Sequence, residues 1–436
     1  MPELRVLIVG ASIAGPMAAY WFAKAGATVT VIERFPRLRS GGQNIDIRLT
    51  GVTVMRKIPG MEDAVRAALA PLDGVGFVDK SGKPIATMRG TGDAEQQSLV
   101  SEFEIFRGEL SRVLVELTKD LDQVKYIFGE HILSIAEQPA DQVGPAKVQF
   151  ANGTPDAEFD LVVACDGATS RTRAMAFGCS VRDHISPMGA WAAYFTTKND
   201  LLNGGRIGLA CSAPGGRALT LGPDQADANR AMAMRVHSRG DDPELDKFRL
   251  ANKEGTDELK RFISQRFQDV GWKSPEIIAE LMESDDLYAS ELCQVKISRL
   301  YKGRVVLVGD AGYAAGPTGT GTSLAMAGAY VLAGEISKHG QDIEAGLKAY
   351  QERMQPIIKD MHVIPPGVLS FLAPQTSWGI VVRNLIFFAV CWASKFASLL
   401  GWLGSAWGAA GFGKDKYDLP DYNFSGDGDI LDPHRG

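Results

Sequence analysis

The sequence predicts an α/β fold in which a parallel sheet is interrupted by a β-rich insertion and followed by apolar helices. Apolar strands occur before and after the β-rich region, at 4–9 and 305–308. Each strand is followed by a glycine-containing turn and a small-residue helix. Continuous apolar strands of this kind are typical of parallel sheets that are covered on both faces. Between them, residues 186–238 alternate short strands with Gly/Pro turns, and polar helices follow over 243–284.

The N-terminal segment predicts a βαβ unit with a strand over 4–9, a helix over 14–26 and a strand over 28–33. The first turn, Gly10-Ala-Ser-Ile-Ala-Gly15, has the form GxSxxG, which is the dinucleotide-binding fingerprint with Ser12 in place of its middle glycine. Glu33 ends the second strand, where a carboxylate can bond to ribose hydroxyls. The alternative for Glu33 is an exposed carboxylate at a strand end.

Two further polar motifs follow strands in the middle of the sequence. Arg107 stands where a short strand passes into a helix over 108–119, and its guanidinium could reach a phosphate or ribityl group. The alternative is a surface arginine at a helix start. After an apolar strand over 158–165, the segment Asp166–Arg173 has the form DGxxSxxR. This motif either contacts an anion or simply caps the start of a helix.

The stretch Arg304–Gly321, RVVLVGDAGYAAGPTGTG, is the most informative candidate for a ligand site. Asp310 lies at the carboxyl end of its strand, where open α/β sheets bind ligands. Gly316 and Gly319 let the backbone approach a ligand closely, and the N–H groups of the next helix can face an anion. Taken alone, the stretch is equally compatible with a tight strand–helix turn.

These four motifs occur in the order and spacing of the FAD-dependent aromatic hydroxylase-like monooxygenases, and the chain resembles that family over nearly its whole length. The family includes para-hydroxybenzoate hydroxylase and the tetracycline-inactivating flavoenzymes. The resemblance implies a Rossmann-like FAD-binding domain with an inserted β-rich substrate domain and C-terminal helices. The FAD contacts that it implies are Gly10, Ser12, Ile13, Ala14, Gly15, Glu33, Arg34, Gly42, Gln43, Arg107, Asp166, Arg173, Asp310, Gly319, Gly321 and Thr322.

The resemblance also implies a role for each group of residues. The turn Gly10–Gly15 would follow the FAD pyrophosphate, with Glu33 on the adenosine ribose, and Gly319–Thr322 would approach the isoalloxazine ring. Arg107 and Asp310 would bind the ribityl and pyrophosphate region. Gly42 and Gln43 match a segment near the ring, and Asp166 and Arg173 match a motif tied to both FAD and the nicotinamide cofactor.

The sequence departs from the family pattern at three places. Ser12 replaces a glycine, Tyr313 stands where many relatives have histidine, and the glycine loop after Pro317 is one residue shorter than in many members. FAD binding is still expected, whereas the surroundings of the flavin ring stay open. Tyr313 is therefore a candidate for facing the substrate.

The implied activity is a monooxygenase that uses FAD, NAD(P)H (NADPH favoured) and O2 to insert one oxygen atom into an aromatic or polyketide-like small molecule through a flavin C4a-hydroperoxide. The alternatives are a flavin-dependent oxidase or reductase on the same fold, and an epoxidase of a terpenoid or alkaloid substrate. No single catalytic residue is assigned, because the flavin carries the chemistry. The substrate-pocket candidates are Trp191, Tyr194, Arg206, Met234, His237 and Tyr313. Each of them has a simpler interpretation as a core or solvated side chain.

The expected division of the chain is discontinuous. The FAD-binding domain would comprise 1–75, 100–180 and 288–350. The β-rich substrate domain would comprise 76–99 and 181–287, and a C-terminal helical segment would follow over 351–436.

Composition excludes several classes of partner and site. The net charge of −6 and the scattered Lys and Arg argue against nucleic acid binding. The five cysteines make no CxxC pair, so we expect buried thiols in a reducing compartment, and no histidine has metal-ligand spacing. The chain starts directly with a strand and shows no signal peptide, which predicts a cytoplasmic protein. The oligomeric state is left open.

The segment Val363–Gly413 contains only two charged residues, Arg383 and Lys395. Prolines, glycines and Lys395 argue against a spanning helix. We expect packed C-terminal helices, with an interfacial membrane contact through 363–413 as the alternative. A membrane-surface protein that binds a lipid-like ligand without catalysis is the competing class of function.

Overall fold

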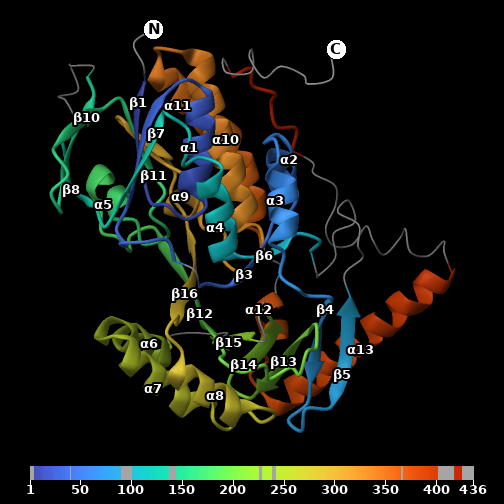
Figure 1. Ribbon diagram of the computed structural model, residues 1–436. Helices are drawn as coiled ribbons and strands as arrows, with labels where there is room; N and C mark the ends of the chain where they lie inside the picture. The colour runs from blue at the N-terminus through green and yellow to red at the C-terminus, as the bar shows by residue number, and fades with distance from the viewer. Residues whose placement is uncertain are drawn as a thin grey trace.

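The computed structural model describes residues 4–39, 41–89, 101–136, 144–224, 228–237, 242–364, 367–400 and 417–424, with the side chains of 394–400 left aside. The chain builds two bodies, one around a six-stranded sheet and one around a seven-stranded sheet (Figure 1).

The six-stranded sheet joins strands from before and after the β-rich insertion, as predicted. Its order is β17-β18-β11-β1-β2-β7. All neighbours pair in parallel except β17, which is an antiparallel edge strand. The strands are β1 Arg5–Val9, β2 Thr28–Glu33, β7 Val124–Phe128, β11 Leu161–Ala164, β17 Tyr301–Lys302 and β18 Val305–Leu307.

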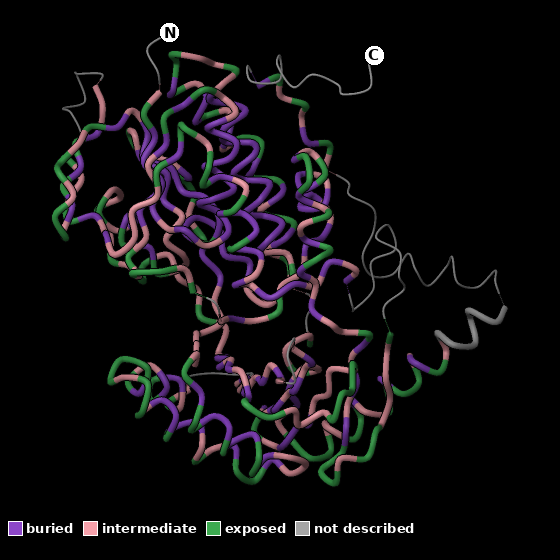
Figure 2. The backbone as a smooth tube through the Cα atoms, in the orientation of Figure 1, coloured by how far each residue is buried: buried purple, intermediate pink, exposed green. Residues whose placement is uncertain are grey.

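Both faces of this sheet are covered, which explains why β11 is apolar throughout and β1 is apolar after the exposed Arg5. On one face lie α1 (Ala14–Lys24) and α10 (Gly321–His339), which pack on each other, and α11 (Ile343–Met361) packs on α10. The other face packs on a small antiparallel sheet. Its strands are β8 Ile132–Ala136, β9 Ala146–Phe150 and β10 Ala157–Phe159. The buried backbone of this body stands out in Figure 2.

Short elements complete the first body. The strands β3 (Asn44–Asp46) and β6 (Glu104–Phe106) form an antiparallel pair of their own. The helices are α2 Thr50–Arg56, α3 Met61–Ala67, α4 Arg107–Glu116, α5 Arg171–Phe177 and α9 Asp310–Tyr313. The segments α4, α5 and α9 begin within the predicted motifs, at Arg107, after Ser170 and at Asp310.

The second body is the predicted β-rich insertion, with strand order β16-β12-β15-β14-β13-β4-β5. The strands are β4 Gly74–Val78, β5 Pro84–Arg89, β12 Ile185–Thr196, β13 Ile207–Ala213, β14 Arg217–Pro223, β15 Asn229–Val236 and β16 Tyr288–Val295. Three helices cover one face of the sheet. They are α6 Pro243–Glu254, α7 Thr256–Phe267 and α8 Ser274–Glu283.

The two faces of the seven-stranded sheet differ, and we call the face opposite α6–α8 the inner face. Trp191 points to the helical face, where it is fully buried and stacks on Phe248 with ring centroids 4.8 Å apart. Side chains alternate along a strand, so Ala190, Ala192 and Tyr194 belong to the inner face. The short α12 (Val368–Leu372) and the long α13 (Ser377–Leu400) contribute side chains to this inner face.

The expected division of the chain changes in two places. β16 pairs with β12, so residues 288–295 belong to the seven-stranded sheet and not to the FAD-binding domain. The segment 351–436 is not one unit either, because α11 packs on α10 of the first body while α13 packs on β5 and β13 of the second. A helix buries its apolar face wherever a matching surface exists, and proximity in sequence does not decide which sheet supplies it.

We predict that Trp191→Ala lowers the free energy of unfolding by about 3–5 kcal/mol, because it leaves a cavity among aromatic side chains. Urea unfolding followed by circular dichroism measures this loss. The matched control is Trp378→Ala, whose side chain is 73% exposed, with an expected change within about 0.5 kcal/mol. Equal losses in the two variants would contradict the assignment of Trp191 to the core.

Candidate functional site

The first turn has the geometry of a dinucleotide cradle. Gly10 adopts φ +107°, and a Cβ there would lie 2.6 Å from the carbonyl oxygen of Cys165. A Cβ on Gly15 would lie 1.8 Å from the carbonyl oxygen of Gly10. Both positions therefore require glycine, for the turn and for the close approach of α1. Ser12, between these two glycines, uses its side chain: its hydroxyl accepts a hydrogen bond from Nε of Arg107 at 3.2 Å.

The carboxylate of Glu33 closes the same turn. Its Oε2 accepts from the backbone N–H of Ala11 at 3.0 Å, and its Oε1 accepts from that of Phe35 at 3.0 Å. Glu33 thus sits at the end of β2, beside the turn that follows β1, where an adenosine ribose would lie. Arg34 is exposed and packs its guanidinium on the ring of Phe35 at 4.8 Å.

A cavity of about 450 Å³ opens from this turn and is lined by charges of both signs. The cations are Arg37, Arg39 and Arg107, and the carboxylates are Glu33, Asp285 and Asp286. Burial lowers the pKa of Arg39, and the nearby Arg107 acts in the same direction. The positive charges of Arg39 and Arg107 repel each other. An anionic group between them, such as a pyrophosphate, would relieve this repulsion. Sequence reasoning found Arg107 but missed Arg39.

Asp310 lies at the other end of this cradle, directly after β18. Its side chain has accessible surface, yet the surrounding protein removes enough water to raise its pKa, and Arg107 opposes that rise. A Cβ on Gly321 would lie 3.9 Å from Oδ1 of Asp310. Gly319 has φ +72° and would place a Cβ 3.4 Å from Oδ2 of Asp46. The two carboxylates therefore flank the glycine loop, and Thr322 is buried just after it.

The Gly42–Gln43 segment lies against Arg107. Gly42 has φ +136°, and a Cβ there would meet the Arg107 side chain at 3.2 Å. The backbone N–H of Arg107 donates to the carbonyl of Gln43 at 3.0 Å. The Oε1 atom of Gln43 is buried without a hydrogen-bond partner among the described residues. A buried acceptor left open in this way fits a polar group of a bound molecule.

The DGxxSxxR motif is an internal brace. Asp166 accepts from the hydroxyl of Ser170 at 2.5 Å and from the backbone N–H of Thr172 at 3.0 Å. Arg173 is fully buried and donates to the carbonyl of Ala311 at 2.6 Å, next to Asp310. The implied direct contact of Arg173 with a cofactor is therefore wrong for this structure. Arg173 acts instead by positioning α9.

Alternation along the strands sorts the substrate-pocket candidates. Trp191 is wrong as a pocket residue, because it lies in the helical core. Tyr194 and Met234 belong to the inner face, where each is half-buried. Burial raises the pKa of Tyr194 to about 12, and its ring stacks on Tyr288 at 6.4 Å.

The remaining two candidates from the insertion lie at the ends of strands. Arg206 precedes β13, has an exposed side chain and pairs with Asp73 at 3.0 Å. By the alternation of side chains along β13, Arg206 lies on the same side of the sheet as the inner-face residues of that strand. The backbone N–H of His237, just after β15, donates to the carbonyl of Gly189 at 2.6 Å.

Tyr313 does not face a substrate. It is 1% exposed, and its hydroxyl bonds to that of Tyr350 at 3.1 Å, which in turn donates to the carbonyl of Leu307 at 2.8 Å. Burial raises the pKa of Tyr313. This residue therefore packs in the helical layer beneath β18, where Gly328 of α10 leaves room for its hydroxyl.

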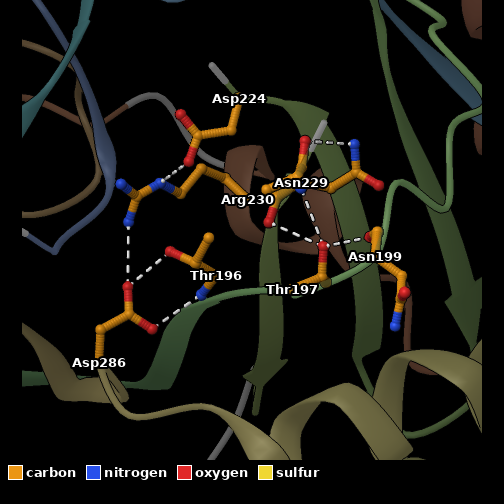
Figure 3. A network of polar contacts seen from close by, with 8 residues as sticks. Thr196, Thr197, Asn199, Asp224, Asn229, Arg230 and Asp286 are labelled. Atoms are coloured by element: carbon orange, nitrogen blue, oxygen red, sulfur yellow. Dashed lines mark hydrogen bonds and ion pairs between the residues drawn. The ribbon is translucent and has the colours of Figure 1, made fainter. Parts of the chain in front are cut away.

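Figure 3 shows a polar network within the second body, and one of its residues, Arg230, also contacts the first body. Asp286 accepts from the backbone N–H of Thr196 at 2.9 Å and from Nη1 of Arg230 at 3.2 Å. Arg230 also pairs with Asp224 at 2.8 Å and packs on the ring of Phe106 at 4.6 Å. Asp286 also lines the cavity beside the Gly10 turn, so this network extends from the seven-stranded sheet to that cavity. No sequence motif marks Arg230 or Asp286.

A second missed feature is a pair of opposed carboxylates. Asp46 and Glu104 are cross-strand partners in β3 and β6. Arg48 is 4% exposed, and its Nε donates to Oδ2 of Asp46 at 3.1 Å. Burial, aided by the charge of Asp46, raises the pKa of Glu104 to about 7. Like charges directly opposite in a sheet are unfavourable, which favours the protonated form of Glu104.

Among the described residues, no three His, Cys, Asp or Glu side chains gather as a metal site would require. None of the helices in the described ranges has the length and apolar character needed to cross a bilayer.

Comparison with known proteins agrees with the cradle. The family described as "FAD binding domain" matches residues 3–363. The chain is 34% identical over 426 residues to the FAD-dependent monooxygenase asL4 of Sarocladium schorii, covering 92% of this chain and 94% of that protein. It is 35% identical over 402 residues to the flavin-dependent monooxygenase eupH of a Phoma species, covering 87% and 90%.

Solved structures share the fold. The tetracycline destructase Tet(55) superposes with a TM-score of 0.73 at 28% identity, covering 97% of this chain and 100% of that one. HpxO of Klebsiella pneumoniae, complexed with FAD and uric acid, superposes with a TM-score of 0.64 at 21% identity, covering 88% and 93%. The latter likeness shows the fold alone.

We predict that Arg107→Ala weakens FAD binding by about ten- to a hundredfold, because it removes a charge-assisted contact at the pyrophosphate. Quenching of flavin fluorescence on titration into the cofactor-free protein measures the dissociation constant. The control is Arg112→Ala on the same helix, whose side chain is 56% exposed and pairs with Glu109, with no expected effect. Equal affinity in the two variants would contradict the cradle.

We predict that the free energy of unfolding falls as the pH rises from about 5 to 8, in part through Glu104. The folded state holds this proton up to about pH 7, whereas the unfolded carboxyl releases it near 4.5. Raising the pH therefore favours the unfolded state, by up to about 3 kcal/mol. Urea midpoints across this range should decline less in Glu104→Gln than in the wild type. Glu116→Gln, at an exposed site, should decline as the wild type does.

Proposed function

The chain belongs to the family of FAD-dependent monooxygenases, and on that premise we propose that it uses NADPH and O2 to insert one oxygen atom into an aromatic or polyketide-like small molecule. The observation that carries the proposal is the clustering of the predicted cofactor residues around Arg107. The cavity beside the Gly10 turn reaches Arg107, the charge of Arg107 acts on Asp310, and Asp310 lies beside Gly321 of the glycine loop.

FAD supplies the redox chemistry when bound, carrying two electrons from NADPH to O2. The balance is substrate, O2, NADPH and one proton on one side, and oxygenated substrate, NADP⁺ and water on the other. Monooxygenases of this family use O2 and a small-molecule substrate. For this chain we propose NADPH as the reductant and an aromatic or polyketide-like substrate.

The residues of this chain hold and orient the reactants. Glu33 would take the ribose hydroxyls, and Arg39 and Arg107 would neutralise the pyrophosphate. The N-terminus of α10, directly after the glycine loop, favours negative charge near the ring. Arg173 and Asp166 keep Asp310 at the strand end through α9.

The inner face offers a flat surface for the substrate. Its half-buried residues include Tyr194, Met232 and Met234, with Thr220 among them. Methionine and aromatic side chains adapt to planar apolar molecules and exclude water. A Cβ on Gly316 would lie 2.6 Å from Sδ of Met188, so the glycine loop reaches β12 of this sheet. This contact supports a substrate site between the loop and the inner face.

Arg206 is the candidate for recognising a polar substrate group. Its guanidinium is exposed at the start of β13 and has a single carboxylate partner, Asp73, among the described residues. An exposed guanidinium at the edge of an apolar surface can stabilise a phenolate or enolate oxygen, which raises the nucleophilicity of an attached ring.

We predict that the purified protein is yellow, and that a phenolic or polyketide substrate stimulates NADPH oxidation with matching O2 consumption. A screen of such compounds, followed by mass analysis of products formed under ¹⁸O2, measures incorporation of one labelled atom. Hydrogen peroxide formation without label in the product would indicate an oxidase. A bound flavin that neither NADPH nor NADH reduces, with any substrate offered, would overturn the proposal.

A further inference from the structure

The outward face of α13 is apolar from Trp378 to Trp392. All eight exposed residues between 378 and 392 are apolar. They are Trp378, Val381, Val382, Leu385, Ile386, Phe388, Ala389 and Trp392. Leu385 is 63% exposed and Trp392 is 60% exposed. Helices on the surface of a globular protein usually turn charged and polar side chains outward, so this arrangement needs an explanation.

The polar residues of this stretch point inward instead. Arg383 is 3% exposed; its Nη2 donates to the hydroxyl of Ser212 at 3.0 Å, and its guanidinium packs on the ring of Phe77 at 3.8 Å. Burial lowers the pKa of Arg383 to about 10. Phe387 packs beside it on Phe77, with ring centroids 4.8 Å apart. The helix is therefore anchored to the second body by this side, which fixes the direction of the apolar face.

The width of the apolar face identifies its surroundings. At about 100° per residue, the exposed side chains cover an arc of about 160°. A helix that pairs with one other helix needs a narrower seam with charges beside it. Here no charged side chain borders the arc between 378 and 392. A face of this width without bordering charges suits the boundary of the acyl chains, into which an interfacial helix sinks one side.

Two further observations favour a lipid surface. Trp378 and Trp392 stand about 21 Å apart at the two ends of the face, and tryptophan prefers the interface between membrane and water. The hairpin of β4 and β5, on which α13 packs, exposes Lys80 and Lys83 at its turn, beside Asp79 and Asp269, and Arg89 at its other end. These cations fit anionic headgroups. α13 also extends away from the sheet at the lower right of Figure 1.

We propose that α13 lies in the surface of a lipid bilayer, with its face of Trp378, Leu385 and Trp392 among the acyl chains and the β4–β5 hairpin on anionic headgroups. The helix docks and does not span, since its other side is fixed to Phe77 and Ser212. This docking is independent of the proposed oxygen insertion, so it is tested without substrate.

The test is flotation of the FAD-loaded full chain with phosphatidylcholine vesicles, with and without phosphatidylglycerol. We expect the wild type to float, and more so with phosphatidylglycerol. The double variant Leu385→Glu/Phe388→Glu should lower the bound-to-free ratio about tenfold or more, because it places charges among acyl chains. The matched control is Leu250→Glu on α6, which is 56% exposed and should float like the wild type.

A second measurement needs no variant. Emission from Trp378 and Trp392 should fall when the vesicles carry bromine on their acyl chains, because that quencher acts only at short range. Absence of flotation and of quenching would overturn the proposal. So would a double variant that folds, binds FAD and floats like the wild type. A wild-type dimer in ultracentrifugation that the double variant dissociates, without vesicle binding, would assign the face to a second copy of the chain and also overturn it.

Discussion

The parallel pairing of β1 with β2 and β11, and of β11 with β18, is the constraint on which the remaining structure depends. Parallel strands bring their carboxyl ends to one edge, so the turns after β1, β2, β11 and β18 meet there although they lie far apart in sequence. Gly10, Glu33, Asp166 and Asp310 are the residues delivered in this way. The parallel pairing therefore places the turn after each strand beside the turns of its neighbours.

The second sheet adds a surface that faces this edge, and strand alternation decides what that surface contains. Trp191 and Tyr194 belong to the same strand, yet an odd separation places them on opposite faces. Trp191 stabilises the packing of α6–α8, whereas Tyr194 remains on the side of the cofactor cradle. Asp286 and Arg230 join β12 and β15 within the second body, and Arg230 packs on the ring of Phe106 in the first body. Hydrogen bonds from Val295 and Gln294 to the carbonyls of Ala314 and Ala315 also connect the two bodies.

The residues that sequence reasoning identified share one property: each sits in a short pattern whose spacing has a direct physical meaning. GxSxxG and the glycine loop mark close backbone approach, and Glu33 marks a strand end. Arg39, Asp46 and Glu104 carry no such pattern, since their significance depends on which residue lies opposite or beside them in space. The outward orientation of the apolar side of α13 also depends on spatial neighbours. Its apolar composition is plain in the sequence, but the burial of Arg383 against Phe77 is what turns the apolar side outward.

The sequence by itself determined the βαβ frame, the discontinuous α/β architecture with its β-rich insertion and the family, because apolar runs and glycine turns encode local backbone geometry. Only the tertiary structure decided that Tyr313 packs in the core and not at the substrate, that Arg173 braces α9 and not a ligand, and that β16 and α13 belong to the second body. These outcomes depend on contacts between segments far apart in the chain. The free energy of burying a side chain is set by the surface that it meets, and that surface exists only once the sheets have formed.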